Sequence, residues 1–328
     1  MSSPALPTQS AFARLWDSAG MLLVLAGLFL VCSLGVDNFL TATNLRGLAL
    51  AVSTIGMVAC TMMFCLAAGD FDLSVGSVVA FAGVLGGTVM NATGSVGAGI
   101  AAALASGALI GLVNGVFVAR LGINALITTL ATMQIVRGLG FIVSDGRAVG
   151  IRTDGFFALG NTAWLGVPVP VWLTVACFLA FGVLLNLTVF GRNALAIGGN
   201  REAAHLAGVP VVRVKVIIFT LQGLVAAFAG LVLAARMTSG QPNTSQGFEL
   251  EVISACVLGG VSLSGGVARI GFVIAGVLIM GLVQNAMNLL NIPPFYQYVA
   301  RGCILLGAVM LDRMKQRELR WPTKLDLW

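Results

Sequence analysis

The chain has 328 residues, of which 58% are hydrophobic and only 9% are charged, and its mean hydropathy is +1.00. Soluble globular domains carry about 25% charged residues, so this composition excludes a soluble protein and indicates that the solvent is lipid. The formal net charge of +6 does not indicate nucleic-acid binding, because the basic residues gather at the ends of apolar runs, where they orient membrane proteins.

Apolar runs of about 20 residues, the length that crosses a bilayer, occur roughly ten times along the chain. They predict the fold class, which is an all-α, polytopic integral membrane protein with a single transmembrane domain over residues 1–328. The runs centre near Phe29, Ile55, Ala82, Leu109, Met133, Cys177, Gly223, Ala255, Leu278 and Leu305. The third and the eighth runs are interrupted or short, so either of them could be re-entrant.

The positions of the lysines and arginines predict that both ends of the chain lie in the cytoplasm. The cytoplasmic segments are then residues 1–19, the loop at 190–211 and the basic tail at 312–328. The outer side receives the loops at 37–44, 144–164, 237–249 and 291–294. The first apolar run, from Gly20 to Val36, is not followed by a signal-peptide cleavage motif, so we expect it to remain as a span.

Acidic residues occur at two span boundaries, as the pair Asp70 and Asp72 and as the pair Glu249 and Glu251. Either pair could form a gate or hinge, and the alternative for Asp70 and Asp72 is that they cap a helix beside glycine. None of the predicted span centres carries an ionisable group, which an ion-coupled carrier usually needs at mid-membrane. We expect Arg137 and Arg301 to snorkel or to pair near span ends.

Two polar stripes at helical spacing are candidates for the path of a neutral solute, which must keep hydrogen-bond partners while it crosses lipid. Their members are Asn124, Thr128 and Thr132 in one stripe and Gln284, Asn288 and Asn291 in the other. The alternative is that these side chains join helix to helix by hydrogen bonds, as polar residues commonly do in membranes.

The inner loop contains a predicted short helix. Asn200 is placed to cap its start, Glu202 lies in its first turn, and Gly208 followed by Pro210 ends it. A helix of about two turns is marginal alone, and its alanines, Ala203 and Ala204, give it a slim profile that could dock into a cytoplasmic protein. A solvated linking loop is the alternative, and we expect His205 to lie at the surface.

Glycines and cysteines add predictions about packing. Gly107, Gly111 and Gly115 repeat at helical spacing, which indicates closely packed helices. The glycine pairs 259–260 and 265–266 predict a tight turn between spans, and a hinge that moves is the alternative. The six cysteines lie inside apolar runs without a C-x-x-C pair, so we expect no disulfide, no metal and no cofactor in this chain.

Several stretches resemble the permease subunits of ABC importers of the monosaccharide class. Glu202, Ala203, Ala204 and Gly208 stand where that family has its coupling glutamate, alanines and glycine. The stretch 69–76, GDFDLSVG, is similar to the G-x-x-D-L-S-V-G pattern of the class, and 257–266 is similar to its paired-glycine turn. The stretches 123–133 and 285–291 look closest to the L-arabinose branch.

This resemblance implies the ABC importer permease fold and a transport subunit that is not itself an enzyme. It implies a homodimer in the bacterial inner membrane, a cytoplasmic ABC ATPase that uses ATP and Mg, and a periplasmic sugar-binding protein. It implies a monosaccharide as cargo, with L-arabinose first, and coupling to the ATPase through Asn200, Glu202, Ala203, Ala204 and Gly208. From their positions alone, Asp70, Asp72, Gly259 and Gly260 are the candidates for gate or hinge roles.

The lysines of this chain agree with a transport subunit that relies on a separate ATPase. A P-loop needs a Gly-Lys pair followed by Ser or Thr, and none of Lys215, Lys315 and Lys324 follows a glycine. Three alternatives are an ion-coupled secondary sugar carrier, a membrane enzyme acting on a lipid-borne substrate, and a passive channel. The enzyme would want clustered acid, base or thiol groups at a membrane face, and the channel would want a selectivity filter.

Overall fold

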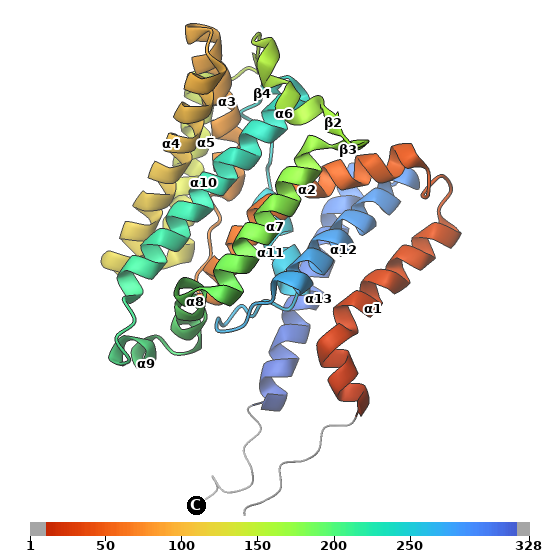
Figure 1. Cartoon of the computed structure of the whole chain (residues 1–328), viewed down its shortest axis with the longest axis vertical. Helices are drawn as coiled ribbons and strands as arrows, with labels where there is room; N and C mark the ends of the chain where they lie inside the picture. The colour runs from red at the N-terminus through yellow and green to blue at the C-terminus, as the bar shows by residue number, and fades with distance from the viewer. Residues whose placement is uncertain (1–10, 320–328) are drawn as a thin grey trace, which may run out of the picture.

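The computed structural model describes residues 11–319, which form a bundle of long helices (Figure 1). The long helices are α1 (Ala11–Gly35), α2 (Ala42–Ala67), α3 (Val75–Thr93), α4 (Val96–Gly115), α5 (Ala125–Ser144), α7 (Val169–Leu187), α10 (Val211–Met237), α12 (Ile270–Leu289) and α13 (Pro294–Leu319). The shorter ones are η1 (Val116–Arg120), η2 (Asp154–Phe156), α6 (Ala158–Asn161), α8 (Val189–Gly199), α9 (Arg201–Leu206) and α11 (Phe248–Leu258). Each of the ten predicted centres lies in a helix.

Seven helical segments in the described part are long and apolar enough to cross a membrane, which confirms the all-α membrane fold. They are α2, α3, α4 with η1, α5, α7, α10 and α12, and α1 adds a shorter apolar segment at Ala19–Gly35. The eighth predicted run differs. Its helix, α11, has 11 residues, about 16 Å of rise, which is half of the roughly 30 Å hydrocarbon core.

The third and eighth runs are interrupted because each begins its helix inside the bundle. The chain leaves α2 at Ala67 and continues in non-helical conformation to Ser74 before α3 starts. The starts of α3 and α11 lie against each other, since a Cβ on Gly76 would be 2.5 Å from Glu249 Oε2 and 2.6 Å from the Ser245 carbonyl oxygen. Two helices therefore begin at one place within the membrane part of the fold.

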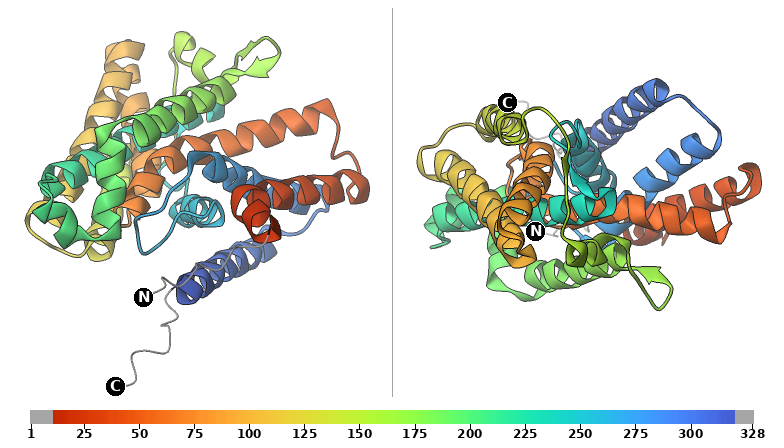
Figure 2. Two further views of the ribbon diagram at one scale, coloured as in Figure 1. Left: turned by 60° about the horizontal axis from the view of Figure 1, so that its bottom comes forward. Right: turned by 90° about the horizontal axis from the view of Figure 1, so that it is seen from above.

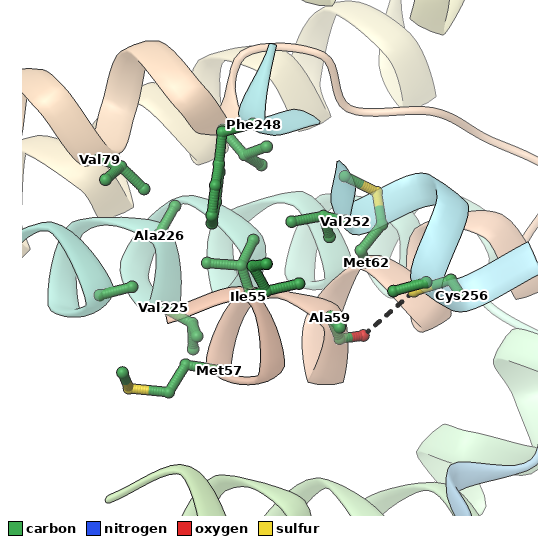
Figure 3. Packing of buried hydrophobic residues seen from close by; sticks show 14 of the residues in the cluster. Ile55, Met57, Ala59, Met62, Val79, Val225, Ala226, Phe248, Val252 and Cys256 are labelled. Carbon is green, nitrogen blue, oxygen red and sulfur yellow. Dashed lines mark hydrogen bonds between the residues drawn. The ribbon is translucent and has the colours of Figure 1, made fainter. Parts of the chain in front are cut away.

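The core lies around α2 and α10, between α3, α4 and α5 on one side and α1, α12 and α13 on the other (Figures 1 and 2). Figure 3 shows part of it, where Phe248 and Val252 of α11 pack near Ile55 of α2 and Val79 of α3. Cys256 Sγ donates to the Ala59 carbonyl oxygen at 3.6 Å.

Glycines allow α4 and α10 to approach backbone to backbone. A Cβ at Gly107, Gly111 or Gly223 would overlap main-chain atoms of the facing helix. This is the close packing that the spacing of glycines in the sequence predicted, and it replaces the hydrophobic drive that lipid does not supply.

The loops lie at the two ends of the helical bundle. At one end, β1 (Val149–Gly150) pairs antiparallel with β4 (Ser239–Gly240), and β2 (Ala163–Trp164) pairs with β3 (Val167–Pro168). Both loops joined by β1 and β4 were predicted on the outer side. The start of α1, the helix α9 and the end of α13 lie together at the opposite end (Figure 1). Of the predicted cytoplasmic segments, 1–10 and 320–328 lie outside the described residues, and residues 312–319 continue α13.

Candidate functional site

The predicted short helix is present as α9, with the caps that the sequence indicated. Asn200 Oδ1 accepts a hydrogen bond from Ala203 N at 2.9 Å. At the other end, Gly208 N donates to the His205 carbonyl oxygen and Val209 N donates to that of Ala204, both at 3.0 Å. Gly208 adopts φ +83°, the left-handed conformation that this helix-ending motif requires.

Helix α9 touches the rest of the chain mainly through Ala204, which is buried, whereas Arg201, Glu202 and His205 are exposed. Leu206 is 87% exposed, more than any other large hydrophobic side chain in the described residues. A single exposed apolar side chain is common at protein surfaces, so Leu206 is a candidate contact because of its place on the capped helix α9.

The base of this loop rests on the paired-glycine turn. Gly266 N donates to the Ala67 carbonyl oxygen at 2.8 Å, and a Cβ on Gly265 would lie 2.7 Å from Gly198 Cα of α8. Gly260, Gly265 and Gly266 all have positive φ, which glycine adopts without steric cost. Gly259 packs on the backbone of Phe272 and Val273 in α12. The three motifs at 69–76, 191–210 and 257–266 thus meet at one end of the fold.

A buried ion pair joins this end to the connection between α2 and α3. Lys215 Nζ lies 2.8 Å from Asp70 Oδ2, with side chains 8% and 10% exposed. Burial raises the pKa of the Asp70 carboxyl, while the Lys215 ammonium and, more weakly, Arg201 oppose that rise. Lys215 was not predicted as a partner from the sequence, although a lysine at the start of an apolar run was a signal for it.

A cavity of about 380 Å³ lies beside the ion pair. It is lined by Gly69, Asp70 and Phe71, by Asn124 at the start of α5, and by Arg201 and Lys215. The first residue of α9, Arg201, therefore lines the same space as the Asp70–Lys215 pair.

Asp72 belongs to a separate buried chain of hydrogen bonds. Ser74 Oγ donates to Asp72 Oδ1 at 2.6 Å, Asn114 Nδ2 donates to Ser74 Oγ at 3.1 Å, and Thr132 Oγ1 donates to Asn114 Oδ1 at 2.7 Å. These hydrogen bonds connect the start of α3 to α4 and α5. Asn114 is its central member, and the sequence analysis had not singled it out.

The first polar stripe divides among three roles. Asn124 caps α5 by accepting from Leu126 N at 2.9 Å and lines the cavity, Thr128 is buried without a hydrogen-bond partner for Oγ1 among the described residues, and Thr132 bonds to Asn114. In the second stripe Gln284 is half-buried, and Asn288 and Asn291 are exposed. Asn288 Oδ1 accepts from Gln297 Nε2 at 2.8 Å. A neighbouring pair that sequence reasoning missed, Asn44 and Asn285, exchanges two amide hydrogen bonds of 3.0 and 2.7 Å.

Four charged side chains are half-buried among the helices. Glu249 and Glu251 are in the first turn of α11, whose start lies against Gly76 of α3. Arg301 pairs with Glu251, as expected, and Arg137 Nη1 donates to the carbonyl oxygens of Pro242 and Thr244 at 2.8 and 2.6 Å. The absence of charges at the predicted span centres therefore does not mean that the interior lacks them.

The family described as branched-chain amino acid transport system / permease component matches residues 44–309. The L-arabinose transport system permease protein AraH of Escherichia coli K12 is 64% identical over 318 residues, 97% of each chain. The L-arabinose ABC transporter permease protein AraH of Azospirillum brasilense is 55% identical, over 94% of this chain and 91% of its own. The ribose import permease protein RbsC of Bacillus subtilis is 40% identical, over 93% and 95%. No solved structure matches the chain significantly.

Proposed function

Because this chain belongs to the family of branched-chain amino acid transport system permease components, we propose that it is the membrane permease of an ATP-driven importer of L-arabinose. The observation that carries the proposal is the 64% identity over 97% of the chain to a relative named as an L-arabinose permease. The ribose permeases match at 36% to 40% identity, which favours L-arabinose over ribose.

The proposed partners are a cytoplasmic ABC ATPase, which uses ATP and Mg, a periplasmic sugar-binding protein and a second copy of this permease. Helix α9 is the proposed contact with the ATPase, through Asn200, Glu202, Ala203, Ala204 and Gly208. The exposed Leu206 and the rigid caps of α9 support docking over a merely solvated loop. The chain then has both ends in the cytoplasm and works in the bacterial inner membrane.

Motion of α9 is proposed to reach the membrane interior through the gate or hinge residues. Asp70 holds Lys215 beside α9, and Asp72 anchors the start of α3. Gly259 and Gly260 shape the turn on which the loop rests. Asn124, Thr128, Gln284, Asn288 and Asn291 stay as proposed path residues. The bond of Thr132 to Asn114 favours a packing role for Thr132.

The test is uptake of labelled L-arabinose in a strain whose own permease for this sugar is deleted. The chain is expressed with its cognate ATPase and binding protein, and D-ribose uptake is measured in parallel. We expect L-arabinose uptake that stops when the P-loop lysine of the ATPase is replaced. Uptake that continues without a working ATPase, or uptake of ribose alone, would contradict the proposal.

A further inference from the structure

Four charged side chains from three helices form what we term the charged row: Arg137 on α5, Glu249 and Glu251 on α11, and Arg301 on α13. Arg301 pairs with Glu251 and also lies over the Tyr298 ring, 5.1 Å from its centroid. Arg137 and Glu249 are near enough to interact electrostatically. Three helices that are far apart in sequence thus bring two cations and two anions close to one another.

The charged row lies within the apolar thickness of the bilayer. Helix α11 ends beside the glycine turn at one end of the fold, so its first turn is about 16 Å from that end. Arg137 lies about 18 Å along α5 from Ala125, and Arg301 about 10 Å along α13 from Pro294. A hydrocarbon core of roughly 30 Å therefore contains all four side chains.

These charges are only partly covered by the chain itself. All four residues are half-buried, and Leu250 between the two glutamates is 50% exposed. Gln134, one turn before Arg137 on α5, is exposed as well. Arg301 Nε is buried and makes no hydrogen bond with the described residues. Charged groups facing lipid cost several kcal/mol, and in membrane proteins they usually face a partner or a water-filled cavity.

We propose that the face formed by Gln134, Leu250 and the charged row lines a water-filled sugar path, and that Glu249 contacts the passing sugar. Glu251 is paired with Arg301, whereas the Glu249 carboxylate lies against Gly76, accepts backbone hydrogen bonds at Gly247 and Glu249, and has Arg137 nearby without a direct pair. A carboxylate has about four lone-pair sites, so it can also accept hydrogen bonds from the hydroxyls of a neutral sugar. This inference rests on the proposed transport function and adds the start of α11 to the proposed path.

Cysteine accessibility tests the aqueous face. Leu250→Cys is compared with Leu179→Cys, whose parent residue is 67% exposed near the middle of α7 with no charged row around it. Cys303, which is exposed, is first replaced by serine. A membrane-impermeant methanethiosulfonate reagent is applied to the assembled transporter from each side, with and without ATP. We expect Leu250→Cys to react at least tenfold faster than Leu179→Cys in one of these conditions.

Equal slow reaction of the two cysteines in every condition would overturn the inference. This readout does not depend on transport, so its failure is distinct from a failure of the proposed function. If L-arabinose uptake is absent while Leu250→Cys reacts, the proposed cargo is wrong and the aqueous face stands. If uptake occurs and Leu250→Cys stays at the control rate, the path lies elsewhere.

The sugar contact is tested with Glu249→Gln and Glu249→Leu. Glutamine keeps an acceptor for sugar hydroxyls, so we expect its uptake to stay within threefold of the parent protein, while leucine lowers uptake at least tenfold. Both replacements are neutral and remove the same negative charge beside Arg137, so a merely structural role would lower folding and uptake alike in the two variants. Uptake is therefore compared per assembled complex. Equal uptake by the two variants would overturn the contact.

Discussion

Lys215 Nζ and Asp70 Oδ2 lie 2.8 Å apart, although the two residues are 145 positions apart in the chain. Lys215 lies in the first turns of α10, shortly after α9 ends at Leu206. Asp70 lies in the non-helical connection that leads from α2 to α3. The pair therefore connects the proposed ATPase contact to the helix that begins inside the membrane. Its burial makes either partner costly to remove alone.

Replacing one partner should destabilise the protein more than replacing both. Asp70→Asn or Lys215→Met alone leaves a buried charge without its counter-charge, which costs about 3–5 kcal/mol. The double variant should recover most of the thermal stability measured by unfolding in detergent. Arg213→Met is the control, because Arg213 is exposed on the same helix as Lys215 and should not change the unfolding temperature. Equal stability of the single and double variants would show that the pair is not coupled.

Leu206→Ser should weaken the association with the ATPase. Burying a leucine at an interface contributes about 1.5–3 kcal/mol, so we expect at least roughly tenfold weaker binding, measured by co-purification over a range of ATPase concentrations. Leu165→Ser is the matched control, since Leu165 is 76% exposed at the opposite end of the fold. Loss of binding in the control, or none in Leu206→Ser, would argue against docking through α9.

Asn114→Leu should loosen the start of α3. The change leaves Ser74 and Thr132 without their shared partner, and each buried unpaired group costs about 1–3 kcal/mol. The loss of stability is measured by thermal unfolding. Asn186→Leu serves for comparison, because Asn186 is exposed and bonds only to Gly182 of its own helix. A Thr132→Val variant as unstable as Asn114→Leu would mean that the Ser74 bond contributes nothing.

Gly111→Ala should destabilise the α4–α10 contact, where the added methyl meets the Phe219 main chain. Overpacking of this kind costs about 1–3 kcal/mol. Gly138→Ala, also within a helix, meets no atom within 4 Å and should be neutral or up to about 1 kcal/mol stabilising. The comparison uses the unfolding temperatures of the two variants in the same detergent. Equal tolerance of both changes would contradict the close packing.

The features predictable from sequence were those encoded within short stretches. The caps of α9 lie within ten residues, from Asn200 to Gly208, so local rules sufficed to place them. The Gly107 and Gly111 spacing likewise revealed a packing face without its partner. Polar stripes were harder, because a Thr132 that bonds to Asn114 and an Asn288 that stays exposed look the same in sequence.

By itself the sequence determined that this chain crosses a membrane as helices, because apolar runs in lipid must satisfy every backbone group internally. It also determined where the helix α9 begins and ends. Only the tertiary structure decided that Asp70 meets Lys215 and that Glu249 lies against Gly76 at the start of α3. Those facts depend on how segments far apart in the chain pack, and hydropathy measures the length of an apolar run but not the depth at which a short helix starts.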